Sequence, residues 1–172
     1  HHSDRLSGSL SYSLMKTEGV SDYVNQGINV QQWGFQVLNQ PYPLSWDQLH
    51  TLKAVIDVLL PLDIGANVVW SYNTGRPYTY FPTRDGFTAE DTTMVFLPNN
   101  SRLPASTTLN IKLSKRFTLG SFTALSMYWD IRNLFNAKNA RWSDANGRIG
   151  GQLGDPSAYY EPRRFSVGVK YE

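Results

Sequence analysis

The stretch Leu6-Ser-Gly-Ser-Leu-Ser-Tyr-Ser-Leu14 decides the fold, because its residues alternate with a period of two. Every second position is leucine, glycine or tyrosine, and each position between them is serine. Successive side chains on a β-strand point to opposite faces, so this pattern predicts a strand with one apolar and one hydroxyl-bearing face. A helix would spread the same residues around its circumference.

The same alternation recurs along the chain and predicts an antiparallel, all-β protein. The six predicted strands cover about residues 5–16, 50–60, 63–74, 107–117, 121–132 and 164–172. Each is roughly ten residues long, whereas the mean strand of a globular protein has about 5 to 6 residues. A tilted strand that crosses a lipid bilayer needs about 9 to 11 residues. The strand length therefore favours a membrane-spanning sheet.

The connections between these strands alternate between short and long. Residues 61–63 join the second strand to the third, and a turn at residues 118–121 joins the fourth to the fifth. The other three connections are long, at about residues 17–49, 75–106 and 133–163. In an up-and-down meander the three long loops all fall at the same end. Short periplasmic turns and long extracellular loops are typical of outer-membrane β-barrels.

Composition excludes several other classes of protein. The 172 residues include no cysteine, so neither a disulfide scaffold nor a cysteine-ligated zinc site can form. The net charge of +2 leaves no basic footprint for nucleic acid. No apolar run approaches the roughly 20 residues of a membrane helix. In a membrane-spanning sheet, a mean hydropathy of -0.38 is expected as the average of a lipid-facing side, a polar side and polar loops.

A period of two also describes a soluble β-sandwich or a lipocalin-like barrel, in which the apolar face points inward. Two features favour the membrane barrel. Polar and charged residues occupy the middle of the predicted strands, which suits a wide, wet lumen. Aromatic side chains gather near the strand ends, as amphipathic rings do at a membrane interface. They are Trp46, Trp70, Tyr72, Tyr78, Phe122, Trp129 and Tyr171.

Six strands are too few to close a barrel, since the smallest bacterial outer-membrane barrels have about eight. Open sheet edges are not tolerated in lipid. One solution is a small eight-stranded barrel with a further strand extension around residues 28–37. The other is that these strands belong to a larger barrel.

Five short patterns point to the larger barrel. They are Leu44-Ser-Trp-Asp47 with His50-Thr-Leu52, Ser71-Tyr-Asn-Thr-Gly-Arg-Pro-Tyr-Thr79, Asn99-Asn-Ser-Arg-Leu-Pro104, Asp130-Ile-Arg-Asn-Leu-Phe-Asn136 and Glu161-Pro-Arg163. In this order and spacing they resemble the C-terminal part of TonB-dependent outer-membrane receptors. The resemblance implies a segment of a 22-stranded barrel, in which the plug domain lies outside these residues. The family's terminal strand typically ends on an aromatic residue, whereas Tyr171 is followed here by Glu172.

The resemblance also implies a function and a location. We expect TonB-dependent uptake of a scarce nutrient, such as a siderophore, glycan or peptide, across the outer membrane of a Gram-negative bacterium. The implied partners are outer-membrane lipid, the rest of the barrel with its plug, the TonB complex through the missing N-terminal part, and the barrel-assembly machinery. The alternatives are a small outer-membrane barrel that acts as an adhesin or passive pore, and a soluble β-sandwich binding module.

The long loops carry the candidate ligand-binding residues, because aromatic and arginine side chains are the usual anchors of recognition surfaces. The candidates are Trp33, Tyr78, Tyr80, Arg84, Arg141, Trp142, Tyr159 and Tyr160. The alternative is that these rings pack the loops together or sit in the interfacial girdle. The candidate lumen-facing residues are Lys53, Asp57, Asn67, Lys112, Asp130 and Arg164.

Metal binding and catalysis find little support. The stretch Ser143-Asp-Ala-Asn-Gly147 lacks the ligand order of a calcium loop, and its Asn-Gly pair predicts a tight turn. Asp47 is close in sequence to His50, but no serine lies in a nucleophile-elbow context. We therefore expect no catalytic residues, no metal site and no cofactor.

Overall fold

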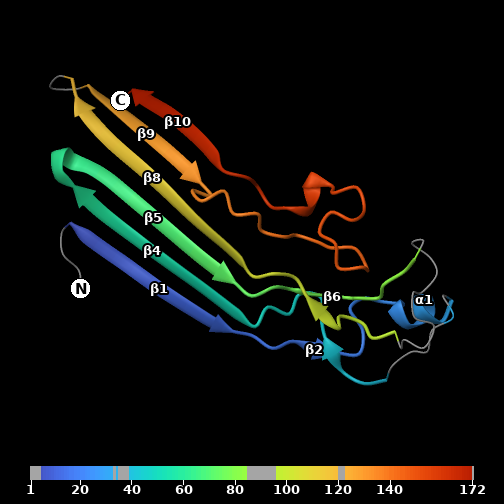
Figure 1. The fold of residues 1–172 in the computed structure, drawn as a ribbon. Helices are drawn as coiled ribbons and strands as arrows, with labels where there is room; N and C mark the ends of the chain where they lie inside the picture. Colours follow the sequence, from blue (N-terminus) through green and yellow to red (C-terminus); the bar gives the residue numbers. More distant parts are fainter. Residues whose placement is uncertain (1–4, 33, 35–38, 85–95, 120–122, 172) are drawn as a thin grey trace.

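Six long strands form a single antiparallel sheet (Figure 1). The computed structural model describes residues 5–32, 34, 39–84, 96–119 and 123–171. The sheet strands are β1 (Leu6–Leu14), β4 (His50–Leu60), β5 (Ile64–Asn73), β8 (Ser106–Thr118), β9 (Ala124–Arg132) and β10 (Arg164–Tyr171). Each long strand pairs with the next one along the chain, in the order β1-β4-β5-β8-β9-β10. The prediction of an all-β meander of about six long strands is confirmed.

The two ends of this sheet differ (Figure 1). At one end, the 3-10 turn η1 (Pro61–Asp63) joins β4 to β5, and residues 119–123 join β8 to β9. Leu62 and Asp63 both have positive φ, which lets the chain reverse within three residues. Strand β1 begins and strand β10 ends at this end, and the three long connections gather at the other.

The long connections contain short elements of their own. In the first, β2 (Glu18–Gly19) pairs with β3 (Tyr42–Pro43), and α1 (Gln26–Gln32) lies between them. In the second, β6 (Pro77–Tyr78) pairs with β7 (Ser101–Arg102), and the third contains η2 (Pro156–Ala158). Among the described residues, no helix has the length and apolar character needed to cross a membrane.

Helix α1 lies where a strand extension around residues 28–37 was one alternative. That alternative is wrong for residues 28–32, which are helical; residue 34 lies in a turn, and residues 33 and 35–38 lie outside the described part of the chain. Val30 is the one buried residue of α1, and asparagine and glutamine surround it. One buried position in seven residues does not match the every-second-residue pattern of a half-buried strand.

The strand register gives the sheet two distinct faces. One row of neighbours on the apolar face runs Gly8, Ile56, Val68, Ile111, Ile131 and Phe165. The adjacent row on the opposite face runs Ser7, Asp57, Asn67, Lys112, Asp130 and Ser166. Each face is continuous across all six strands, because the pairing has no slip between neighbours.

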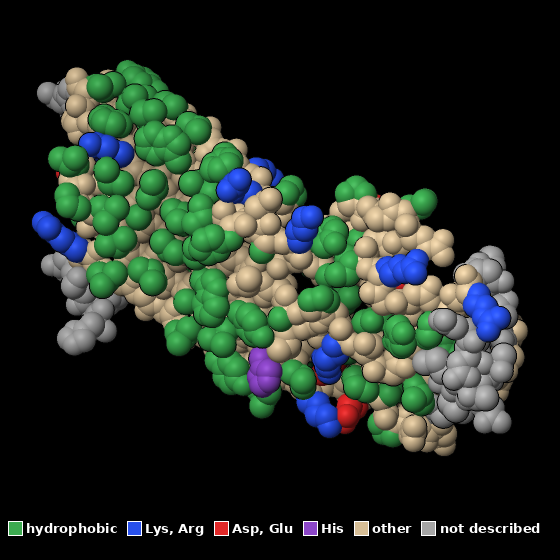
Figure 2. All heavy atoms as spheres, viewed as in Figure 1, with side chains coloured by type: hydrophobic (Ala, Val, Ile, Leu, Met, Phe, Trp, Pro, Cys, Tyr) green, Lys and Arg blue, Asp and Glu red, His purple; other side chains and the backbone are tan. Residues whose placement is uncertain are grey.

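Burial is concentrated in the loops rather than on the sheet. The buried hydrophobic residues include Val30, Tyr42, Leu44, Phe81, Ala140 and Ala158, all in the long connections. On the apolar face of the sheet, Leu10 is 70% exposed, Phe165 65% and Val167 63%. Figure 2 shows hydrophobic side chains spread over the strands, with more mixed chemistry over the loops. No second layer of the described chain covers this face.

Candidate functional site

A close crossing of two loop segments forms the base of the loop assembly. The backbone of Gly75 passes so near Leu103 that a Cβ on Gly75 would lie 1.5 Å from the Leu103 carbonyl oxygen. The Leu103 N–H donates to the Arg76 carbonyl at 2.9 Å beside this point. Gly75 therefore serves a close approach of two backbone segments, which a residue with a Cβ could not make.

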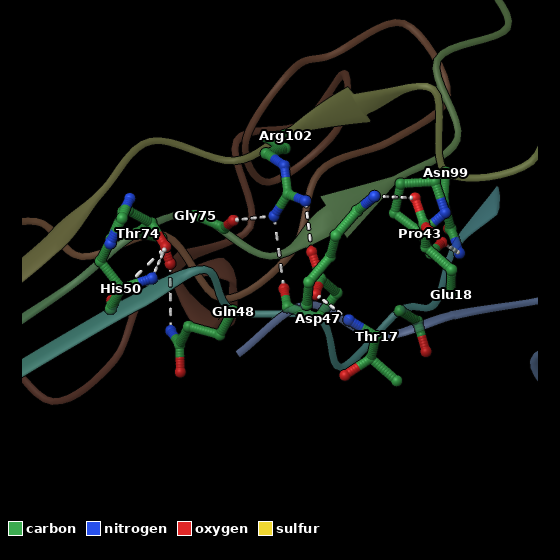
Figure 3. A network of polar contacts seen from close by, with 12 residues as sticks. Thr17, Glu18, Pro43, Asp47, Gln48, His50, Thr74, Gly75, Asn99 and Arg102 are labelled. Atoms are coloured by element: carbon green, nitrogen blue, oxygen red, sulfur yellow. Dashed lines mark hydrogen bonds and ion pairs between the residues drawn. The ribbon is translucent and has the colours of Figure 1, made fainter. Parts of the chain in front are cut away.

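A buried ion pair lies next to the crossing (Figure 3). Asp47 is 1% exposed, and its Oδ2 pairs with the Arg102 guanidinium. The Thr17 N–H donates to Asp47 Oδ1 at 2.6 Å, and Arg102 Nη1 donates to the Gly75 carbonyl at 3.1 Å. The Asp47 carboxylate and the Arg102 guanidinium thus join four segments: the start and the end of the first long loop, and the start and the returning part of the second.

These contacts change the pKa of the buried carboxyl. Burial raises the pKa of Asp47, but the hydrogen bonds from Arg102 and Thr17 outweigh it, so the pKa lies below the ordinary aspartate value. His50 has different partners: its Nδ1 lies 2.9 Å from the Tyr12 hydroxyl, and the two rings stack. The two side chains that are close in sequence therefore do not form a pair.

Asn99 joins the first two loops at a second point. Its Nδ2 donates to Asp22 Oδ2 and to the Pro43 carbonyl, both at 2.8 Å. Its N–H donates to Thr79 Oγ1 at 3.0 Å, and the side chain is 7% exposed. Asn99 thereby holds the Asp22 carboxylate close to Tyr42. Burial of Tyr42 and the charge of Asp22 raise the pKa of the Tyr42 hydroxyl.

Asparagines fix the third loop in the same way. Asn139 accepts from the Thr107 N–H at 2.9 Å and donates to the Thr107 carbonyl at 2.8 Å. Asn133 donates to the carbonyls of Ala137 and Glu161, and Asn110 Oδ1 accepts from the Asn133 N–H at 2.9 Å. An asparagine amide carries both a donor and an acceptor, so it can replace a strand neighbour for an irregular backbone.

The tips of the second and third loops also touch. Asn146 Oδ1 accepts from the Thr83 N–H at 2.7 Å, and the Phe81 N–H donates to the Ala145 carbonyl at 2.8 Å. Gly147 has a φ of +78° and donates its N–H to the Asp144 carbonyl. The predicted tight turn at Asn146-Gly147 is confirmed.

Within the described residues, no group of three or more His, Asp or Glu side chains could hold a metal ion.

A cleft of about 500 Å³ lies at the loop end of the polar face and is here called the loop-end cleft. Its floor is formed by polar-face residues of the strand ends, including Asn73, Thr108 and Asn110. Arg76, Arg132, Arg141, Tyr160 and Glu161 line its walls. The cleft therefore combines three guanidinium groups, one carboxylate and many hydrogen-bonding groups.

The structure brings some predicted binding residues together and separates others. Arg141 and Tyr160 line the loop-end cleft. Tyr80 and Arg84 line a second hollow with Arg148, at the contact between the loop tips. The Tyr78 hydroxyl lies with the Tyr80 ring beside Gly147. The Trp142 ring is near Gly151, and the Tyr159 ring is near Lys138. Trp33 lies outside the described residues.

Two arginines of the cleft were missing from the sequence-based candidates. Arg76 lies in the Gly-Arg-Pro segment, and Arg132 lies in Asp130-Ile-Arg-Asn133 at the end of β9. Both segments stood out as patterns, but nothing local in either one shows that they meet Arg141 around one hollow. For Arg132 the available signal was its position at the end of β9 on the polar face.

All six residues predicted to face a lumen lie on the polar face. The register places Lys53, Asp57, Asn67, Lys112, Asp130 and Arg164 there. Asn67 Nδ2 donates to Asp57 Oδ1 at 2.7 Å, and Lys112 Nζ lies 5.2 Å from the centre of the Tyr128 ring. That ring lies directly over Gly168, where any Cβ would overlap it.

Comparisons with family models, with curated protein sequences and with solved structures find no match for this chain.

Proposed function

We propose that this chain forms part of the wall and the extracellular loops of an outer-membrane barrel that takes up a scarce nutrient with energy from TonB. The proposal includes the 22-stranded barrel type and the Gram-negative outer membrane. One observation carries it: a six-stranded meander has a continuous, uncovered apolar face, with the loops gathered at one end.

The uncovered apolar face supports a lipid environment. Exposed apolar side chains extend across every strand of the sheet, for example Leu10 on β1 and Val167 on β10. Soluble monomers rarely expose contiguous apolar patches larger than a few hundred Å². Hydrocarbon chains of a bilayer would cover this face along the full strand length. The opposite face has charged residues in mid-strand, which suits water in a lumen.

The sheet edges support a barrel larger than six strands. Strands β1 and β10 each pair on one side only among the described residues, and lipid does not tolerate such open edges. Further strands would pair with both edges and continue the two faces. The loop assembly at one end would then form part of the entrance to the lumen.

Single-cysteine labelling tests the membrane position, because the chain has no cysteine of its own. A cysteine at Val68 should react poorly with a membrane-impermeant maleimide on intact cells, while a cysteine at Arg84 should react readily. The complete protein should also fractionate with the outer membrane. A protein that stays soluble without detergent and unfolds cooperatively would overturn the proposal and favour a soluble β-domain.

Growth on limiting nutrients tests the transport role. Cells are supplied with an iron chelate, a glycan, a peptide or cobalamin as the limiting source. Deletion of the gene and deletion of TonB should abolish growth on the same nutrient. Normal growth on every nutrient after deletion of the gene, or growth that needs this protein without TonB, would contradict TonB-dependent uptake.

A further inference from the structure

We propose that the loop-end cleft binds a soluble organic anion with two or more carboxylate or phosphate groups. This inference names the chemical class of ligand for the proposed uptake role, and in that respect it rests on the proposed function.

Cations outnumber anions around the cleft. Arg76, Arg132 and Arg141 line it from three separate segments, and Glu161 is its acidic lining residue. The Glu161 carboxylate lies 3.7 Å from the Arg164 guanidinium, which partly offsets its charge. Guanidinium groups bind carboxylates and phosphates through paired hydrogen bonds, so three of them suit a ligand with several such groups.

Two of these guanidinium groups are free to bind a ligand. The side chains of Arg76 and Arg141 are exposed and make no hydrogen bond or ion pair with any described residue; their backbone groups alone bond to Leu103 and Ala158. Arg132 differs, because its Nε lies 3.3 Å from Asp130 Oδ2. Arg76 and Arg141 therefore supply most of the attraction for an anion. Arg132, at the end of β9, is already partly neutralised by Asp130.

The remaining lining is suited to an organic body rather than a bare ion. Leu103, Pro104 and Pro162 give apolar contact surface, and Tyr160 adds an aromatic ring. Asn73 and Thr108 add neutral hydrogen-bonding groups. A volume of about 500 Å³ is in the range of small-molecule sites.

The position of the cleft selects a soluble ligand over a lipid headgroup. Its strand residues, such as Asn110 and Arg132, belong to the polar face. The apolar face, which lipid would cover, is on the other side of the sheet. A solute that enters among the loops can reach the arginines, whereas a bilayer headgroup cannot.

Binding of two anionic probes to the complete detergent-purified protein tests the inference. Calorimetry would measure the dissociation constants of tricarballylate and pyrophosphate, with maltose as a neutral probe. We expect binding of at least one anion, no binding of maltose, and weaker anion binding at higher salt. The double variant Arg76→Gln/Arg141→Gln should raise the dissociation constant roughly tenfold or more, because charge-assisted hydrogen bonds are lost.

The matched control is the double variant Lys16→Gln/Arg148→Gln, which neutralises two loop cations that do not line the loop-end cleft. Its dissociation constants should stay within about twofold of the unmodified protein, and Arg76→Lys/Arg141→Lys should retain part of the affinity. Absence of anion binding, equal binding of maltose, or equal loss in both glutamine variants would overturn the inference. Anion binding in a protein whose uptake does not need TonB would contradict the proposed function alone. TonB-dependent uptake that is unchanged in the Arg76→Gln/Arg141→Gln variant would contradict the anion site alone.

Discussion

The sheet and the loop assembly of this chain are held together in different ways. Along the sheet, the backbone ladder joins neighbouring strands, and the alternation of side chains decides what each face contacts. In the loops, single polar side chains bond to backbone groups far away in sequence, as Asp47 does with Thr17 and Asn99 with Pro43. The sheet should therefore be sensitive to which face a change occupies, and the loops to individual residues.

The largest expected effect comes from charge on the apolar face. Val68→Arg should destabilise the folded protein in a bilayer by about 2 to 4 kcal/mol, the cost of arginine near the bilayer midplane. Asn67→Arg, on the next residue and the opposite face, should cost far less. Unfolding in lipid vesicles with urea measures both. Equal losses would show that the two faces of the sheet do not differ in environment.

The next effect tests the loops. Asp47→Ala leaves the Arg102 guanidinium without its carboxylate and the Thr17 N–H without its acceptor. Loss of one partner of a buried pair costs about 3 to 5 kcal/mol, and the partial exposure of Arg102 reduces our expectation to about 2 to 3 kcal/mol. Thermal unfolding and amide exchange in residues 15–17 and 99–103 measure the loss. The control is Asp144→Ala, which removes a hydrogen bond to nearby Arg148 only; a similar loss there would contradict a special role for Asp47.

Gly75→Ala tests the backbone crossing between the sheet and the loops. The new Cβ would meet the Leu103 carbonyl, so the two segments must separate. Overpacking of this kind costs about 1 to 3 kcal/mol. The same change at Gly154, which has open space around it but a positive φ, measures backbone strain without a clash. A smaller loss at Gly75 than at Gly154 would show that the crossing opens easily.

The same contrast explains what the sequence could predict. Alternation in stretches such as Leu6–Leu14 assigns every sheet residue to a face, because the strand period is a local property. Asp47 and Arg102 are 55 residues apart in the sequence. The short strands of the loops, such as β7, have only two residues each, so they show no periodic pattern that could be detected. Helix α1 has seven residues and one buried position, so its pattern is equally weak. The cleft arginines were missed for the same reason, since their meeting depends on tertiary contacts.

The smallest expected effect is a pH dependence confined to the loops. Asp47 has a lowered pKa in the folded protein, so its carboxylate stabilises the fold fully above the ordinary aspartate pKa of about 3.9. That contribution is lost as the pH falls through the lowered value. Because Asp47→Asn cannot ionise, its melting temperature should lie below that of the unmodified protein at pH 6, and the gap should narrow toward pH 3. The sheet supplies the internal reference, since amide exchange in β4 and β5 should change much less than at Thr17. If the difference in melting temperature between the two proteins stays the same from pH 6 to pH 3, the charge on Asp47 adds nothing beyond its hydrogen bonds.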